Sequence, residues 1–200
     1  NIIRQKAVPD LVREYEQYRK EYGEATLNTP QFLTVGFYHI SHAFYVQWLN
    51  DNEKKEYQHM ALVLCKYTAK KYGSVLHPAC EISAPCILHG RKIIVYPNSI
   101  IDANCCLEAG VFIAGALDEE DLIEKGNTRI EKGVTIKEGA QLIDGVKIGQ
   151  NSVVEKDVIL IGDEIDDNYY VGVGGVRIPI KKKEDYVKYA GFIEISEEIE

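Results

Sequence analysis

Residues 76–112 read LHPACEISAPCILHGRKIIVYPNSIIDANCCLEAGVF and carry an apolar residue at every sixth position. Neither a helix nor an ordinary hairpin has a period of six. A sustained six-residue period is typical of a triangular coil of three short strands, in which the periodic residue points inward and a small residue four places later fits the corner. The periodic positions are Leu76, Ile82, Leu88, Ile94, Ile100, Cys106 and Phe112, and the companions include Cys80, Cys86, Asn98, Asn104 and Gly110.

The period resumes beyond an acidic stretch that lies between Phe112 and Ile130. These two residues are eighteen positions apart, so the stretch is predicted to leave the frame in phase. The sequence therefore predicts one parallel β-helix over residues 74–180 and a separate tail over residues 181–200. The second run of periodic residues is Ile130, Ile136, Leu142, Ile148, Val154 and Leu160, with companions Val134, Ala140, Val146 and Ser152.

Residues 1–73 follow a helical pattern instead. Apolar and aromatic residues recur there at spacings of three and four, and turn or cap residues bound each segment. The pattern predicts a helical bundle that precedes the β-helix. The expected helices run from Pro9 to Gly23, from Thr29-Pro30 to about Trp48, and from about Glu53 to Lys71 with Gly73 as the stop.

Charge and cysteine content limit the partners. The 200 residues carry a net charge of −8, which argues against nucleic acid or an anionic membrane surface as the main partner. The five cysteines form no zinc-like CxxC pair, which suits a reducing compartment. No stretch has the length and apolarity of a signal peptide or membrane span. We therefore expect a cytoplasmic protein.

Three stretches resemble the hexapeptide-repeat acyltransferases, and within them the serine O-acetyltransferases. Gly36-Phe37 with His42-Ala43-Phe44 is similar to that family's Gly-Phe and Arg-Ile-Ala-His-x-Leu helix. Residues 76–82 resemble its Ile-His-Pro-Ala-x-x-Ile motif, and His89-Gly90 follows at the matching distance. Residues 149–158 and 173–178 resemble its Gly-x-x-Ser-Val-Val-x-x-Asp-Val and closing Gly-Val-Pro-Ala-Arg-Ile segments.

The resemblance implies a left-handed β-helix that assembles into homotrimers or hexamers, with active sites in the clefts between neighbours. It implies acetyl transfer from acetyl-CoA to a small hydroxyl acceptor. L-serine, the acceptor in cysteine biosynthesis, is one candidate. No metal cofactor is expected.

His89 is the candidate catalytic residue, because it takes the position of the family's catalytic histidine. Histidine suits a general base since its pKa lies near working pH. A residue that follows the inward Leu88 should also face an intersubunit cleft. The alternative is a surface or interface histidine without chemistry. Packing roles are expected for the other histidines His39, His42 and His77, and a solvated position for His59.

The acceptor region departs from the family pattern. Val75 and Leu88 stand where the family has aspartates, and Asn127 stands where it has a second histidine. Asn127 and Arg129 are still expected to face the acceptor. The acidic stretch could supply carboxylates to an amine-bearing acceptor, although a charge run is usually a solvated face. Its carboxylates are Asp118, Glu119, Glu120, Asp121 and Glu124.

The coenzyme side keeps more of the family pattern. Ala114-Gly115 and Gly139-Ala140 resemble its small residues, which let the backbone approach a pantetheine arm closely. Arg177 and Lys181 could neutralise the nucleotide phosphates. Tight turns of the β-helix and a solvated tail explain the same residues equally well.

Two other functions stay open at this point. A catalytically silent relative could act as an assembly or regulatory subunit, which the departures at Val75, Leu88 and Asn127 favour. A zinc enzyme on the same coil would need three converging histidines. The β-helix region holds only His77 and His89, which argues against zinc.

Overall fold

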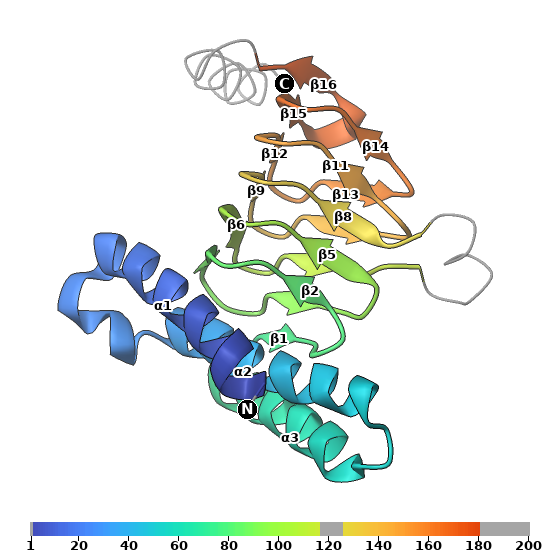
Figure 1. The fold of residues 1–200 in the computed structure, drawn as a ribbon. Helices are drawn as coiled ribbons and strands as arrows, with labels where there is room; N and C mark the ends of the chain where they lie inside the picture. Colours follow the sequence, from blue (N-terminus) through green and yellow to red (C-terminus); the bar gives the residue numbers. More distant parts are fainter. Residues whose placement is uncertain (1, 117–125, 181–200) are drawn as a thin grey trace.

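The computed structural model describes residues 2–116 and 126–180, and it places three helices at one end of a β-helix (Figure 1). The helices are α1 (Ile2–Tyr22), α2 (Pro30–Asn50) and α3 (Lys55–Tyr72), with a short 3₁₀ helix, η1 (Gly23–Asn28), after α1. The second and third helices begin and end within about two residues of the predicted limits. The first begins at Ile2, seven residues before the predicted start, so Pro9 lies inside it.

Local chemistry explains most of these limits. Thr29 takes the extended N-cap conformation and Pro30 follows at the first helical position, where its missing N–H costs nothing. Gly73 ends α3 in the left-handed conformation with φ 78°, which a residue without Cβ adopts most easily. The predicted start of α1 was wrong because proline is typical of helix starts, and the sequence upstream gives no competing cap signal.

In the described ranges, fifteen parallel strands form the β-helix, three per coil, and one antiparallel strand closes it. The first face stacks β1 (Val75–Leu76), β4 (Ile94–Val95), β7 (Phe112–Ile113), β10 (Gln141–Ile143) and β13 (Ile159–Ile161). The second stacks β2 (Glu81–Ile82), β5 (Ser99–Ile101), β8 (Thr128–Ile130), β11 (Lys147–Ile148) and β14 (Glu164–Ile165). The third stacks β3 (Cys86–His89), β6 (Cys105–Glu108), β9 (Thr135–Ile136), β12 (Val153–Val154), β15 (Tyr169–Val171) and the antiparallel β16 (Arg177–Pro179).

Between Leu88 and the acidic stretch, each inward-facing residue lies one position later in the sequence than predicted. Leu76 pairs with Val95, nineteen positions on, because the connection after β3 holds one extra residue. The core residues are therefore Val95, Ile101, Leu107 and Ile113, all fully buried. The predicted core residues Ile94, Ile100, Cys106 and Phe112 are only partly buried. Consequently the acidic stretch does not preserve the phase as predicted.

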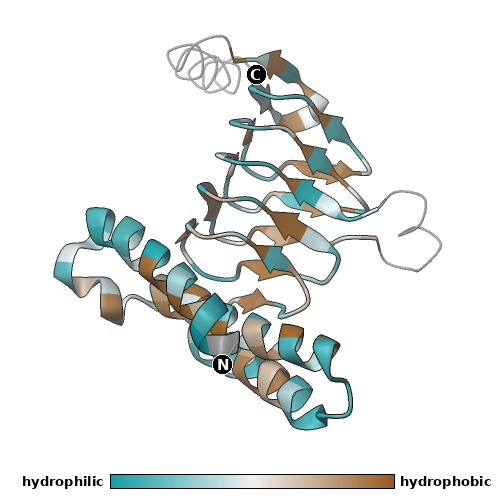
Figure 2. Cartoon of the chain, in the orientation of Figure 1, coloured by the Kyte–Doolittle hydropathy of each residue, from teal (hydrophilic) through white to brown (hydrophobic). Residues whose placement is uncertain are grey.

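The second run of the frame is confirmed. Its six periodic residues are buried, as are the four companions. A turn residue with positive φ precedes each companion, and Gly133, Gly139 and Asn151 are examples. Asn98, Asn104 and Gly110, predicted as companions, are turn residues of this kind, which follows from the same one-residue shift. Figure 2 shows the apolar strand positions repeated from coil to coil.

Candidate active site

His89 lies at the end of β3 on the outside of the first coil. Leu88 beside it is buried in the core, so strand alternation points the imidazole outward. The His89 Nδ1 atom lies 3.2 Å from Oε1 of Glu21 on α1, and both side chains are 40% exposed. Glu108 on β6 is the strand neighbour of His89. The site therefore combines an exposed imidazole with a carboxylate from the helical segment.

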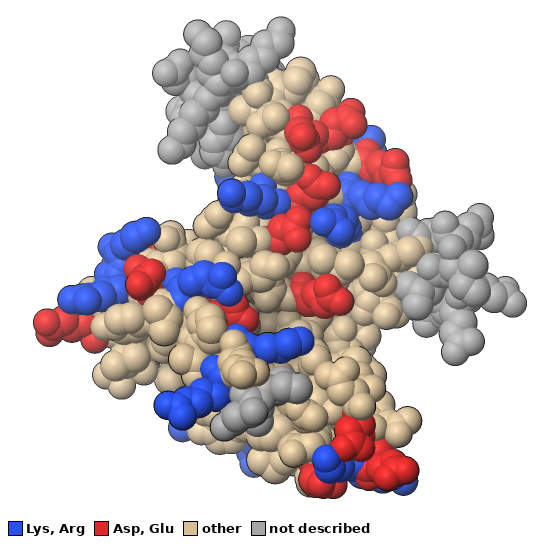
Figure 3. All heavy atoms as spheres, viewed as in Figure 1, with Lys and Arg blue, Asp and Glu red and all other residues tan. Residues whose placement is uncertain are grey.

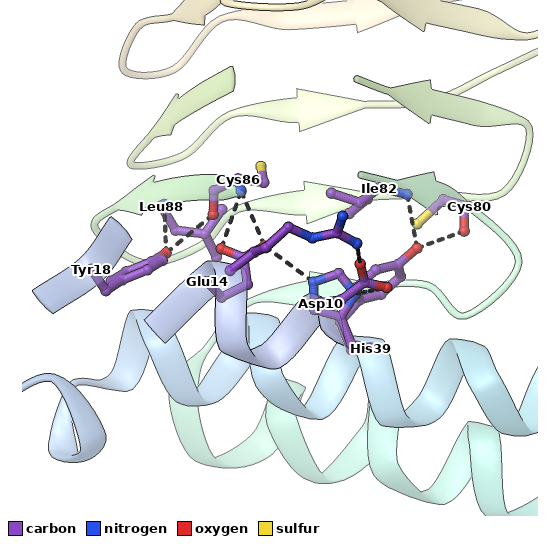
Figure 4. A network of polar contacts seen from close by, with 10 residues as sticks. Asp10, Glu14, Tyr18, His39, Cys80, Ile82, Cys86 and Leu88 are labelled. Carbon is purple, nitrogen blue, oxygen red and sulfur yellow. Dashed lines mark hydrogen bonds and ion pairs between the residues drawn. The ribbon is translucent and has the colours of Figure 1, made fainter. Parts of the chain in front are cut away.

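Side chains of α1 hold the strand that carries His89 (Figure 4). The Tyr18 hydroxyl accepts the Leu88 N–H at 2.7 Å and donates to the Cys86 carbonyl at 3.4 Å. The buried Glu14 carboxylate accepts the Cys86 N–H at 3.0 and 3.1 Å and contacts His39 Nε2 at 3.1 Å. Burial raises the pKa of Glu14, while His39 and the Cys86 N–H oppose the rise. These contacts satisfy the edge of β3 that faces away from β6, where the described residues place no further coil.

The helix α2 caps the neighbouring strand in the same way. The Tyr38 hydroxyl donates to the Cys80 carbonyl at 2.8 Å and accepts the Ile82 N–H at 2.9 Å. One turn later His42 Nδ1 lies 2.8 Å from the Pro78 carbonyl, and burial lowers the pKa of His42. The predicted packing roles of His39 and His42 fit these contacts, which are structural.

The other titratable groups near the site offer little chemistry. Burial lowers the pKa of His77, whose Nδ1 accepts the Ala79 N–H. Cys106 lies on the outer side of β6, and burial together with Glu108 and Glu21 raises its pKa to about 12. A thiol with such a pKa is a poor nucleophile at neutral pH. His59 is exposed on α3, as expected.

A groove of about 360 Å³ follows the corner that connects the third face to the first. Its lining begins at Arg91 and Lys92, directly after His89-Gly90, and both side chains are exposed. Neither makes an ion pair with any residue in the described ranges. We call this feature the corner groove; it is lined by Arg91, Lys92, Ala109, Gly110, Glu138, Gly139 and Asp157.

Among the predicted coenzyme residues, Gly139 lines the corner groove and Ala140 follows it with a fully buried side chain. Ala114 is also buried, and a Cβ on Gly115 would lie 2.1 Å from the Asn98 carbonyl oxygen. The need for glycine at position 115 is thus explained by packing between coils.

Two further coenzyme candidates lie away from the corner groove. The Arg177 guanidinium contacts Asp163 at 2.5 Å and the Glu164 carbonyl at 3.2 Å, beside the corner between the first and second faces. Lys181 lies outside the described residues. Arg91 and Lys92, which the sequence analysis missed, are the cations beside His89, and their position directly after His89-Gly90 was the signal.

The predicted acceptor residues lie at a different corner from His89. Asn127 is exposed just before β8, and Arg129 on β8 pairs with Asp102 at 3.5 Å. Asn127 is at the corner between the first and second faces, and Arg129 lies just after it on the second face. His89, in contrast, borders the corner between the third and first faces. The acidic residues 118–121 and 124 lie outside the described ranges. Within one chain, the structure does not bring His89 together with Asn127 and Arg129.

The surface charge is mixed on the side that contains the second face (Figure 3). Two of its cations have acidic partners, in the pairs Lys147–Glu164 and Arg129–Asp102. In the part of the chain that the structure describes, no helix is long and apolar enough to span a membrane. The same residues contain no group of three or more His, Cys, Asp or Glu side chains able to hold a metal ion.

A larger cavity of about 810 Å³ is lined by parts of α1 and α2 and by residues 79–84 of the first coil. Its polar lining includes Lys6, Arg13, His42 and Glu81. None of the predicted site residues lines it. The candidate active site therefore consists of the surface around His89 together with the corner groove.

Comparisons with known proteins first define the class. No protein-family model matches the chain. A serine acetyltransferase from Brucella abortus strain S19, solved in complex with coenzyme A, matches with a TM-score of 0.71 and 19% identity, covering 90% of this chain and 72% of that one. A soybean serine acetyltransferase apoenzyme matches with a TM-score of 0.68 and 22% identity, covering 88% and 69%. The fold is thus a helical segment followed by a left-handed hexapeptide-repeat β-helix, as predicted.

A comparison of sequences also finds a serine acetyltransferase. The chain is 21% identical over 167 residues to a serine acetyltransferase of Bacillus subtilis (strain 168), which covers 83% of this chain and 72% of that protein. In sequence and in fold, the chain resembles serine acetyltransferases.

Proposed function

We propose that the protein is an acetyl-CoA-dependent O-acetyltransferase that acts on a small hydroxyl compound. The observation that carries the proposal is the outward His89 with Glu21 at its Nδ1, on a fold shared with serine acetyltransferases. An exposed imidazole beside a carboxylate is suited to proton transfer. The Bacillus subtilis relative supports the same reaction class.

In the proposed reaction, His89 Nε2 removes the proton of the acceptor hydroxyl as its oxygen attacks the thioester carbonyl. The tetrahedral intermediate then collapses, the carbon–sulfur bond breaks, and CoA leaves as the thiol after receiving the proton from the imidazolium. General base catalysis of this kind contributes on the order of 10²–10⁴-fold in rate. Cys106 is not used as a nucleophile, in keeping with its raised pKa.

The corner groove is the proposed coenzyme site. It starts beside His89 and runs past the small residues Ala109, Gly110 and Gly139, which leave room for an extended arm. Arg91 and Lys92 add positive charge at its start, beside His89, which favours an anionic ligand in the groove. The Arg177 guanidinium already contacts Asp163 and the Glu164 carbonyl, which makes Arg177 a weaker candidate for binding the coenzyme phosphates.

The acceptor site is proposed to form between copies of the chain, in a homotrimer or in a hexamer of two trimers. His89 lies on the first coil, whereas Asn127 and Arg129 lie on the third coil at a different corner, so they can meet only across an interface. L-serine is the first candidate acceptor, since it is the acceptor named for the matching enzymes. The five free cysteines further support a cytoplasmic location.

The test measures CoA released from acetyl-CoA by chromatography, with L-serine and a panel of other hydroxyl compounds. His89→Ala should abolish release, whereas His59→Ala, which alters an exposed histidine on α3, should not change it. Release that survives in His89→Ala would remove His89 from the mechanism. Absence of release with every acceptor, in folded protein, would instead indicate a silent assembly subunit.

A further inference from the structure

Three acidic or phenolic side chains of α1 contact β3 in chain order. Glu14 binds the Cys86 N–H, Tyr18 binds the Leu88 N–H, and Glu21 contacts the His89 imidazole. Their spacings of four and three residues place them on one stripe of the helix. The stripe therefore follows the strand from its buried part to the exposed histidine.

We propose that Glu21 is a positioning residue that fixes the tautomer and orientation of His89. In this proposal Glu21 accepts the Nδ1–H of the imidazole, which leaves Nε2 unprotonated and directed away from α1 toward the acceptor. A hydrogen bond at one ring nitrogen sets which nitrogen carries the proton in neutral histidine. The proposal rests on the role of His89 given above, and it makes the helical segment a part of the active site.

The anchoring of α1 makes this contact well defined although it is exposed. Tyr18, one turn before Glu21, is fully buried and stacks on Tyr22 with ring centroids 5.9 Å apart. Glu14, a further turn back, is also fully buried. Both grip the backbone of β3, so the helix and the strand that carry the pair cannot shift independently.

Glu108, the other carboxylate near His89, is already engaged. It neighbours His89 across the strand pair, but its Oε2 accepts the Glu138 N–H at 3.1 Å. Glu21 is the carboxylate in the described residues with an ion-pair distance to the imidazole. An exposed ion pair contributes little to stability because solvent screens its charges. Its removal should therefore alter catalysis far more than folding.

The test compares Glu21→Gln with Glu16→Gln, which changes an exposed glutamate on the same helix, away from β3. We expect Glu21→Gln to lower kcat by roughly 10- to 100-fold, less than complete loss of a general base would. The KM for acetyl-CoA and the melting temperature should stay unchanged, and Glu16→Gln should behave as wild type. Wild-type kcat in Glu21→Gln would overturn the proposal.

A second measurement does not depend on activity. Long-range ¹H–¹⁵N spectra of the imidazole at alkaline pH report which His89 nitrogen carries the proton. The wild type should show the Nδ1–H tautomer, and Glu21→Gln should shift the population toward Nε2–H. If the protein releases no CoA at all, this result still decides the positioning role, and identical tautomers in the two proteins would overturn it.

Discussion

The backbone N–H and C=O groups of the strands find hydrogen-bond partners in different ways at the capped end of the β-helix and in its middle coils. In the middle, each strand pairs with strands of the coils before and after it, at an interval of eighteen residues between the later coils and a longer one across the acidic stretch. At the capped end, side chains of α1 and α2 replace the missing coil, and Tyr18 and Tyr38 each both donate and accept a hydrogen bond.

The difference explains where function can arise. The middle coils repeat one solution, with a buried aliphatic residue on each face and a small companion after it. The capped end must instead accommodate polar and titratable side chains, because an uncovered strand edge exposes unpaired N–H and C=O groups. His89 lies where this irregular cap meets the regular coil.

The largest contrast is expected between two adjacent isoleucines of β5. Ile101 is fully buried, whereas Ile100 is partly exposed on the same strand. Ile101→Ala should cost about 2–5 kcal/mol in the free energy of unfolding, and Ile100→Ala should cost less than about 1 kcal/mol. Urea denaturation of both variants measures the difference. Equal costs would contradict the one-residue shift of the core frame.

A smaller effect is expected from the cap. Tyr18→Phe removes the hydroxyl that pairs with Leu88 and Cys86 and should cost about 1–3 kcal/mol, because the Leu88 N–H is left buried without an acceptor. Tyr15→Phe is the control, since its hydroxyl makes no hydrogen bond within the described residues. Thermal denaturation of the two variants should separate them by several degrees. No difference would mean that the hydroxyl does not hold β3.

The buried carboxylate gives the cap a pH dependence. The pKa of Glu14 is raised in the folded protein, chiefly by burial, so the unfolded chain loses this proton at lower pH than the folded one. The stability contributed by this group is fully present below the ordinary value of 4.5 and is lost as pH rises through the folded pKa. The stability of the wild type relative to Glu14→Gln should therefore decline as pH rises above 4.5. Melting temperatures across pH 4–8 measure this difference, and an increase would contradict the assigned direction.

The smallest effect is expected on the second face. Lys147 and Glu164 form an exposed pair on neighbouring coils. Lys147→Gln should leave the free energy of unfolding measured by urea denaturation nearly unchanged, because solvent screens the charges. A loss comparable to that of Tyr18→Phe would show that the regular coils depend on surface polar contacts as much as the cap does.

The sequence predicted the repetitive part of the molecule better than its irregular parts. The second run of the six-residue frame was correct because its coils have uniform length, as the pairing of Leu142 with Leu160 shows. The first run was predicted wrongly beyond Leu88, since adjacent apolar residues at Ile94-Val95, Ile100-Ile101 and Cys106-Leu107 make either frame look apolar.

The candidate site was predictable only in part. His89 could be proposed from its motif, and the strand alternation beside Leu88 supports its outward direction. The contact with Glu21 could not, because sixty-eight residues separate the two and only the packing of α1 against β3 joins them. Arg91 and Lys92 directly follow His89-Gly90, which was the available signal, but the sequence does not show that their corner lines a groove.

The most direct test of this account is a crystal structure of the protein with bound CoA. We expect the sulfur to lie beside His89 Nε2 and the arm to follow the corner groove past Ala109, Gly110 and Gly139. A bound coenzyme whose sulfur lies at the corner beside Asn127 of the same chain, away from any copy of His89, would contradict it.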